Sequence, residues 1–99
     1  MANCITNGNL YENGKANEIK VNTGANIKIQ AKGTGTFQLV GKLIEGNDKK
    51  ILMLVDLSDF STVATVDSEN IYAGDVSGLD SVTVQNVNGF EKIWCTITD

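Results

Sequence analysis

The sequence predicts an all-β protein, an antiparallel β-sandwich of jelly-roll-like form with about seven or eight short strands and little or no helix. Apolar and polar residues alternate with a period of two along most of the chain, and no window of about 11 residues carries the apolar repeat of an amphipathic helix. The chain has ten glycines and no proline, so its turns depend on Gly and Asn, which tolerate positive φ angles.

Three strands are expected in the first half of the chain. Residues 18–22 and 27–32 alternate, with Ile, Val and Ala on one side and mostly charged or amide residues on the other. A third strand follows at residues 36–44. Residues 23–26 and the Gly-Thr-Gly sequence at 33–35 are predicted to be the turns between these strands.

The middle of the chain contains an apolar segment and a less regular one. Residues 51–56 are apolar on both faces, which predicts a central strand covered on both sides, either by the opposing sheet and a loop or by another subunit. Residues 58–66 are interpreted as an irregular loop followed by a short strand. Residues 70–75 are expected to form another short strand.

Two strands are expected at the end of the chain, at residues 81–87 and 91–98. Asn88-Gly89 between them favours a tight hairpin turn of type I′. In the last strand the alternation places Ile and Cys side chains on one side and Trp94 on the other.

The N-terminal segment differs in character from the rest. Residues 1–17 are rich in Asn, and only Ile5, Leu10 and Tyr11 are suited to packing. We interpret this segment as an arm or a first strand, ordered by its own sheet or by docking on a neighbouring subunit. Residues 18–99 are expected to form the β-sandwich domain, and a chain of 99 residues fits one domain.

The composition argues against an enzyme. The chain has no histidine and no arginine, which removes the usual general base and the planar group that grips carboxylates and phosphates. Eight lysines against twelve acidic residues give a net charge of −4, which argues against nucleic acid as a partner. We predict no catalytic residue, no cofactor and no metal.

The two cysteines, Cys4 and Cys95, match no metal-ligand spacing. We expect free thiols in a reducing compartment, with a disulfide between them as the alternative. The chain begins without the basic and apolar regions of a secretory signal, and its longest apolar run, residues 51–55, is too short to span a bilayer. No membrane partner is therefore expected.

Four aspartates lie close to predicted turns: Asp56 and Asp59 near the end of the apolar segment, and Asp75 and Asp80 on either side of a glycine turn. Their spacing matches no calcium-binding loop. A pair of carboxylates is also what a glycosidase needs, held across a sugar. We favour the simpler interpretation, in which these side chains accept hydrogen bonds from nearby backbone amides.

Two sets of residues are candidates for contact with other molecules. The candidate interface consists of the apolar strand and two aromatic residues: Tyr11, Ile51, Leu52, Met53, Leu54, Val55 and Trp94. In an alternative function, Tyr72 and Trp94 bind a glycan, because aromatic rings pack against the apolar faces of sugars. For Trp94, intersubunit packing, sugar stacking and a plain edge or core position all remain open.

Parts of the chain resemble small virion proteins of tailed bacteriophages. The resemblance lies in three stretches: residues 27–37 with 41–43, residues 71–84 with their Gly78-Leu79 turn, and residues 86–89. The resemblance is one of pattern. The first stretch has a strand, a small turn and a second strand, and the second stretch has an aspartate followed by a Gly-Leu turn.

The resemblance implies a non-enzymatic structural component of a phage virion, a capsid decoration, head-fibre or tail protein that acts through protein–protein assembly. We accordingly expect a homo-oligomer, with a trimer favoured, that contacts other virion proteins and is located in the virion after synthesis in the host cytoplasm. The alternative is a small carbohydrate-binding or host-adhesion β-sandwich module. The resemblance carries over no catalytic residues.

Overall fold

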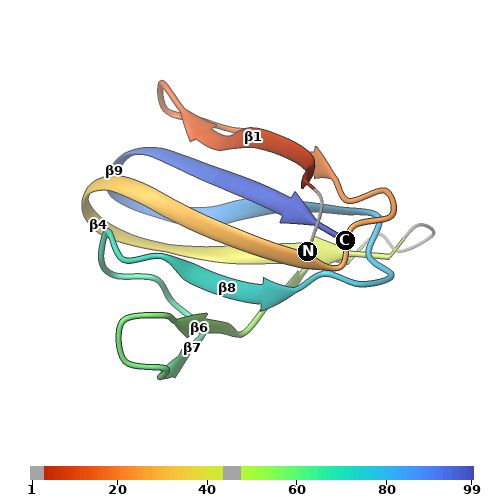
Figure 1. The fold of residues 1–99 in the computed structure, drawn as a ribbon. Helices are drawn as coiled ribbons and strands as arrows, with labels where there is room; N and C mark the ends of the chain where they lie inside the picture. The colour runs from red at the N-terminus through yellow and green to blue at the C-terminus, as the bar shows by residue number, and fades with distance from the viewer. Residues whose placement is uncertain (1–3, 44–47) are drawn as a thin grey trace.

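The computed structural model describes residues 4–43 and 48–99, apart from the side chains of residues 4 and 5, and shows nine strands in one antiparallel sheet (Figure 1). The strands are β1 (Cys4–Glu12), β2 (Lys15–Ala16), β3 (Ile19–Lys20), β4 (Asn26–Lys42), β5 (Lys50–Ile51), β6 (Leu54–Asp56), β7 (Thr62–Val63), β8 (Tyr72–Asp75) and β9 (Ser81–Thr98). The predicted all-β class is confirmed. Within the described ranges no helix is long and apolar enough to cross a membrane.

Two long strands, β4 and β9, form the frame of the molecule. They pair antiparallel from Asn26 opposite Thr98 to Lys42 opposite Ser81. Both strands curve back halfway, so this ribbon supplies strands to both layers of the sandwich (Figure 1). The sheet order is β2-β1-β9-β4-β8-β6-β7, with β3 added on β9 and β5 added on β4.

The two expected turns at residues 33–35 and at Asn88-Gly89 are not turns, and those predictions are wrong. They lie opposite each other inside β4 and β9, where the ribbon bends and its register shifts. Gly33 has a φ of 116° and Gly89 a φ of 86°. A positive φ occurs in a bulge as well as in a turn. The glycines therefore do adopt the positive φ that the sequence predicts, but they form a corner within two continuous strands instead of two turns.

The core lies between the two layers of the bent ribbon. Ile27, Ile29 and Ala31 are buried as predicted, on alternate positions of the first half of β4. Phe37, from the second half of β4, packs edge-on against Phe90 of β9, with 5.5 Å between the ring centroids. Burial of these side chains is the main force that holds the two halves of the ribbon together.

Residues 51–56 do not form the predicted central strand. They divide into β5, which pairs with the second half of β4, and β6, which pairs with β7 and β8 in the other layer. The segment therefore crosses between layers, and one straight strand cannot do this. Leu54 is fully buried, whereas Ile51 and Met53 are 44% and 56% exposed.

The N-terminal segment forms the strand β1, paired antiparallel with the second half of β9. Leu10 of β1 is fully buried, and Tyr11 is half-buried against the core. Cys95 is a buried free thiol opposite Gly8 of β1. The side chain of Cys4 lies outside the described part of the structure.

Candidate functional site

Trp94 lies in the middle of the outer sheet face formed by β1, β9, β4 and β8. In register it is opposite Asn9 of β1 and Gln30 of β4. Its indole is 36% exposed, while its neighbours in β9, Ile93 and Cys95, are buried. The predicted alternation, with Trp94 outside and Ile93 and Cys95 inside, is confirmed.

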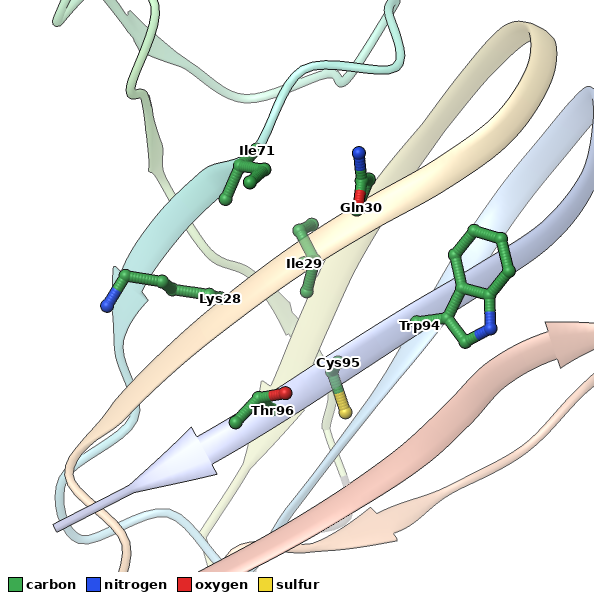
Figure 2. Close-up of a pocket in the computed structure, with 7 residues that line it drawn as sticks. All are labelled: Lys28, Ile29, Gln30, Ile71, Trp94, Cys95 and Thr96. Carbon is green, nitrogen blue, oxygen red and sulfur yellow. The ribbon is translucent and has the colours of Figure 1, made fainter. Parts of the chain in front are cut away.

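Two open depressions flank this indole ring. One, of about 320 Å³, is lined by Lys28, Ile29, Gln30, Ile71, Trp94, Cys95 and Thr96. The other, of about 350 Å³, is lined by Asn7, Gly8, Asn9, Trp94, Cys95 and Thr96. The two share three residues, so we treat them as one feature, the Trp94 trough, that extends from β1 across β9 and β4 to Ile71, just before β8. Figure 2 shows the indole with a broad side of its rings to the viewer on the outer face.

The β1 side of the indole is fixed by a small charged network. Lys92 Nζ lies 5.4 Å from the centre of the Trp94 ring and 2.9 Å from Glu12 Oε2. The same carboxylate oxygen accepts a hydrogen bond of 3.1 Å from Asn9 Nδ2. A cation–π contact and an ion pair together restrict the orientation of the ring.

Amide and hydroxyl groups line part of the trough, beside the apolar side chain of Ile71. Thr96 Oγ1 donates a hydrogen bond of 2.8 Å to Asn7 Oδ1. Gln30 Nε2 donates a long one, of 3.4 Å, to the backbone oxygen of Glu69. Asn7 Nδ2 and Gln30 Oε1 have no hydrogen-bond partner in the described residues. The trough thus combines one aromatic surface with polar groups that retain bonding capacity.

A second exposed aromatic residue, Phe60, lies in the loop between β6 and β7. It is 77% exposed, and its φ is 62°. A bulky side chain rarely adopts this left-handed conformation, which costs of the order of 1–2 kcal/mol relative to ordinary backbone. We call residues 57–61 the Phe60 loop.

Hydrogen bonds that two aspartates accept hold the Phe60 loop. Asp56 Oδ1 accepts from the amide of Ser58 at 2.9 Å and from its hydroxyl at 2.7 Å. Asp59 Oδ1 accepts from the amide and hydroxyl of Ser61 at the same two distances. The amide of Phe60 donates to the backbone oxygen of Asp56 at 2.6 Å. These bonds define the left-handed backbone at Phe60.

Hydrogen bonds and burial shift the pKa values of two ionisable groups near these features. The hydroxyl and amide of Ser58, with help from the Asn70 side chain, hold the pKa of Asp56 below its usual range. Burial raises the pKa of the Cys95 thiol to about 11, although a hydrogen bond from the Gly8 amide opposes the shift. Cys95 therefore stays a protonated thiol at neutral pH and is no nucleophile.

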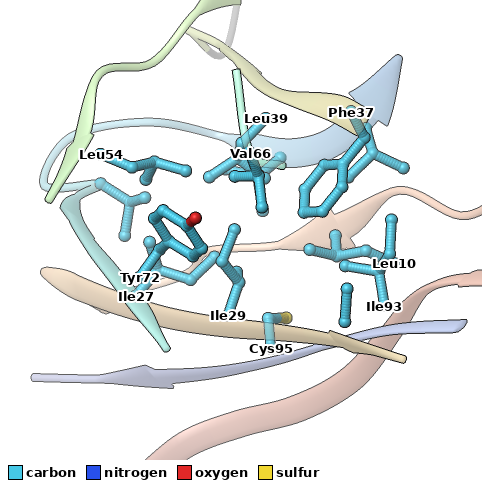
Figure 3. Close-up of a cluster of buried hydrophobic side chains, with 14 of the residues drawn as sticks. Leu10, Ile27, Ile29, Phe37, Leu39, Leu54, Val66, Tyr72, Ile93 and Cys95 are labelled. Atoms are coloured by element: carbon cyan, nitrogen blue, oxygen red, sulfur yellow. The ribbon is translucent and has the colours of Figure 1, made fainter. Parts of the chain in front are cut away.

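The structure corrects one predicted ligand-binding residue. Tyr72 is 1% exposed, and Figure 3 shows its ring among the buried side chains with Ile27 and Leu54. Its hydroxyl lies 2.8 Å from Ser68 Oγ, and burial raises its pKa. Tyr72 is a core residue and cannot stack on a sugar. Of the two predicted glycan-binding residues, only Trp94 is therefore accessible.

The predicted interface residues separate into inner and outer groups. Leu52 and Leu54 pack in the core, and Val55 is half-buried. Ile51 and Met53 are exposed on the surface. Tyr11 and Trp94 lie elsewhere, on β1 and β9.

Three of the four aspartates accept backbone amide bonds in turns, as the sequence indicates, whereas the side chain of Asp80 forms an ion pair instead. Besides Asp56 and Asp59, Asp75 accepts a bond of 2.8 Å from the amide of Ser77. Asp80 lies 2.9 Å from the ammonium of Lys20. Among the described residues, no group of three or more acidic or Cys side chains is placed to hold a metal ion.

Sequence reasoning missed several residues of both features. Asn7, Asn9, Gln30 and Ile71 gather around Trp94 only through the pairing of four strands, which the sequence does not display. The sequence places Phe60 in an irregular loop and indicates no role for it. The one available signal is weak: an aromatic residue between Asp and Ser, where turn-forming side chains predict exposure.

The fold is shared with two solved structures. No known family matches the chain, and no curated protein sequence matches it. The SPBc2 prophage-derived protein YomS superposes with a TM-score of 0.81 at 17% identity, covering 100% of this chain and 96% of YomS. The PBSX exported protein XepA superposes with a TM-score of 0.79 at 17% identity, covering 95% of this chain but 37% of XepA. Both neighbours are phage-derived, and at this identity the likeness establishes a common fold.

Proposed function

We propose that this protein is a non-enzymatic structural component of a phage particle, a capsid decoration, head-fibre or tail protein that works through protein–protein assembly. The observation that carries the proposal is Phe60, an aromatic side chain 77% exposed in a left-handed backbone conformation. Residues held in a costly conformation cluster at functional sites. The phage origin of the two structural neighbours, and the resemblance of the sequence to virion proteins, support the phage setting.

The Phe60 loop has the properties of an interface anchor. Aromatic residues that enter a pocket on a partner contribute much of the binding energy of protein interfaces. The aspartate hydrogen bonds hold Phe60 in place before binding, which reduces the entropy lost on association. Ile51 and Met53, exposed on the chain segment that leads to β6, supply further apolar surface.

The first partner that we propose is another copy of the chain. Most soluble homo-oligomers are closed and symmetric, and a trimer is the form that we favour. Other virion proteins are the second partners, in the assembled particle. In this proposal the protein resides in the virion after synthesis in the host cytoplasm.

The test is the mass of the purified chain in solution by light scattering, compared with the monomer mass of 10.6 kDa. We expect a closed oligomer for the natural sequence and a monomer for Phe60→Asn, because Asn tolerates the left-handed backbone and lacks the anchor. Asn13→Gly is the matched control, since Asn13 also has a positive φ, of 55°, in a turn distant from the Phe60 loop along the chain.

Two results would count against the proposal. The first is a monomer that also fails to sediment with the parent phage particle. The second is a Phe60→Asn variant that keeps the mass of the natural chain and the same attachment to the particle. A loss of mass in Asn13→Gly as well would show that the effect is a general one on the fold.

A further inference from the structure

The Trp94 trough has a different chemistry from the Phe60 loop. Its aromatic surface is the indole, with the exposed Ile71 as a second apolar side chain at one side. Asn, Gln, Thr and Lys side chains lie around them. The fully buried centre of a protein interface is apolar and depleted of charged residues. A flat aromatic ring bordered by amides and hydroxyls instead matches a sugar, which has an apolar ring face and a rim of hydroxyl groups.

The length of the trough indicates more than one sugar ring. Its lining runs from β1 across β9 and β4 to Ile71, which directly precedes β8. It therefore covers up to three interstrand steps of about 4.8 Å each, roughly 14 Å in all. Trp94 is in the second of these strands, with one depression on each side. A linear ligand that crosses the strands can therefore stack one ring on the indole and extend in both directions.

Groups that can bond sugar hydroxyls lie on both sides of the indole. On the β1 side, Asn7 Nδ2 has no hydrogen-bond partner among the described residues, since the bond from Thr96 uses its oxygen. On the β4 side, Gln30 Oε1 is available because its nitrogen carries the bond to Glu69. One donor and one acceptor thus face the two halves of the trough.

Charge distinguishes the two ends of the trough. On the β1 side, Lys92 is paired with Glu12. Towards β8, Lys28 has no carboxylate within ion-pair distance among the described residues. Figure 2 shows its ammonium group extended away from Trp94. Lys28 is diagonal to Trp94 across the β4–β9 pair, a spacing of about 7–8 Å between backbone positions.

From these observations we propose that the Trp94 trough binds a linear oligosaccharide with an acidic group, in which one pyranose ring stacks on Trp94 and a carboxylate of the next unit pairs with Lys28. This goes beyond assembly, because the lining of the trough contains none of the residues of the Phe60 loop.

The experiment is a titration of the full chain with oligosaccharides of equal length, an oligogalacturonate and a neutral chito-oligosaccharide. Trp94 is the only tryptophan, so its fluorescence reports this site alone, and titration calorimetry gives a second readout. We expect the acidic oligomer to change the emission and to bind at least tenfold more tightly than the neutral one, as a charge-assisted bond predicts. Galacturonic acid itself should bind more weakly than its oligomer.

Two variants make the test specific. Lys28→Gln should remove the preference for the acidic oligomer and leave weak binding to both. Lys50→Gln is its control, because Lys50 of β5 also has no ion-pair partner in the described part of the chain and should change nothing. Trp94→Ala should abolish the calorimetric signal.

Three outcomes would overturn the proposal. One is the absence of any change in fluorescence or heat with either oligosaccharide. Another is equal affinity for the acidic and neutral forms in the natural chain. The third is a Trp94→Ala variant whose mass by light scattering falls to that of a monomer, which would identify the trough as a contact between copies.

Discussion

The Trp94 trough and the Phe60 loop each expose an aromatic side chain, but the two regions are built in different ways. Trp94 is 36% exposed and lies on β9, the longest strand, opposite Gln30 of β4. Phe60 is 77% exposed and is held by hydrogen bonds within a few residues of itself. The position of Trp94 therefore depends on the whole fold, and that of Phe60 depends on local side chains. Substitutions can test this difference directly.

The corner of the β4–β9 ribbon should give the largest effect. A methyl group on Gly35 would overlap the carbonyl of Asn88 in the facing strand, and the two backbones would have to separate. We expect Gly35→Ala to lower the free energy of unfolding by about 3 kcal/mol, near the upper end for overpacking. The measurement is urea denaturation with Trp94 fluorescence as the readout. We also expect the emission of the folded Gly35→Ala variant, before urea is added, to differ from that of the natural chain.

Gly14→Ala provides the comparison for this corner. Gly14 has a φ of 77° but no neighbouring atom near the position of an added methyl group. The variant should lose about 1 kcal/mol from backbone conformation alone, with the emission of Trp94 unchanged. Equal losses in the two variants would contradict the argument, because they would show that crowding at the corner costs nothing.

The Phe60 loop should respond most to Asp56. Asp56→Ala removes the acceptor for Ser58 and for the Asn70 side chain, so we expect stability to fall by less than in Gly35→Ala and association to weaken. Asp75→Ala, in another aspartate turn, should lower stability and leave association intact. Chemical denaturation and light scattering provide the two readouts.

The same carboxylate predicts a dependence on pH. Because the pKa of Asp56 is lowered in the folded chain, the unfolded chain binds a proton first as the pH falls. The stabilisation is present above the ordinary aspartate pKa of about 3.9 and is lost as the pH falls through the lower pKa of the folded state. Below about pH 4, the free energy of unfolding should therefore fall less steeply with decreasing pH in Asp56→Ala than in the natural chain. Parallel curves would show that Asp56 does not contribute.

The limits of sequence reasoning follow the same division between long-range and local structure. Alternation along a single strand was sufficient to place Ile29 in the core and Trp94 on the outer face. The corner was missed because a positive φ at Gly33 suits a hairpin turn as well as a bulge, and only pairing with the distant Phe90 distinguishes them. The trough was missed for the same reason, since Asn9 and Gln30 meet Trp94 through register.

Phe60→Asn should make the isolated chain more stable. Phe in the left-handed conformation is strained, whereas Asn adopts it readily, so the variant should gain up to about 1 kcal/mol. Little packing is lost, because the side chain is mostly exposed. The comparison requires denaturation at high dilution, where association adds nothing to stability. A loss of stability would indicate that Phe60 serves the fold of the monomer.

The smallest effect should come from the contact between Lys92 and Trp94. Lys92→Met keeps the apolar stem but removes the ammonium that lies 5.4 Å from the ring and pairs with Glu12. Exposed cation–π contacts and surface ion pairs each contribute less than about 1 kcal/mol, so the unfolding midpoint should barely move. The fluorescence anisotropy of Trp94 should nevertheless fall, because the ring gains freedom. An unchanged anisotropy would mean that the Lys92 contact does not hold the indole and that strand register alone does. Trp94 would then depend entirely on the fold, whereas Phe60 depends on hydrogen bonds from neighbouring residues.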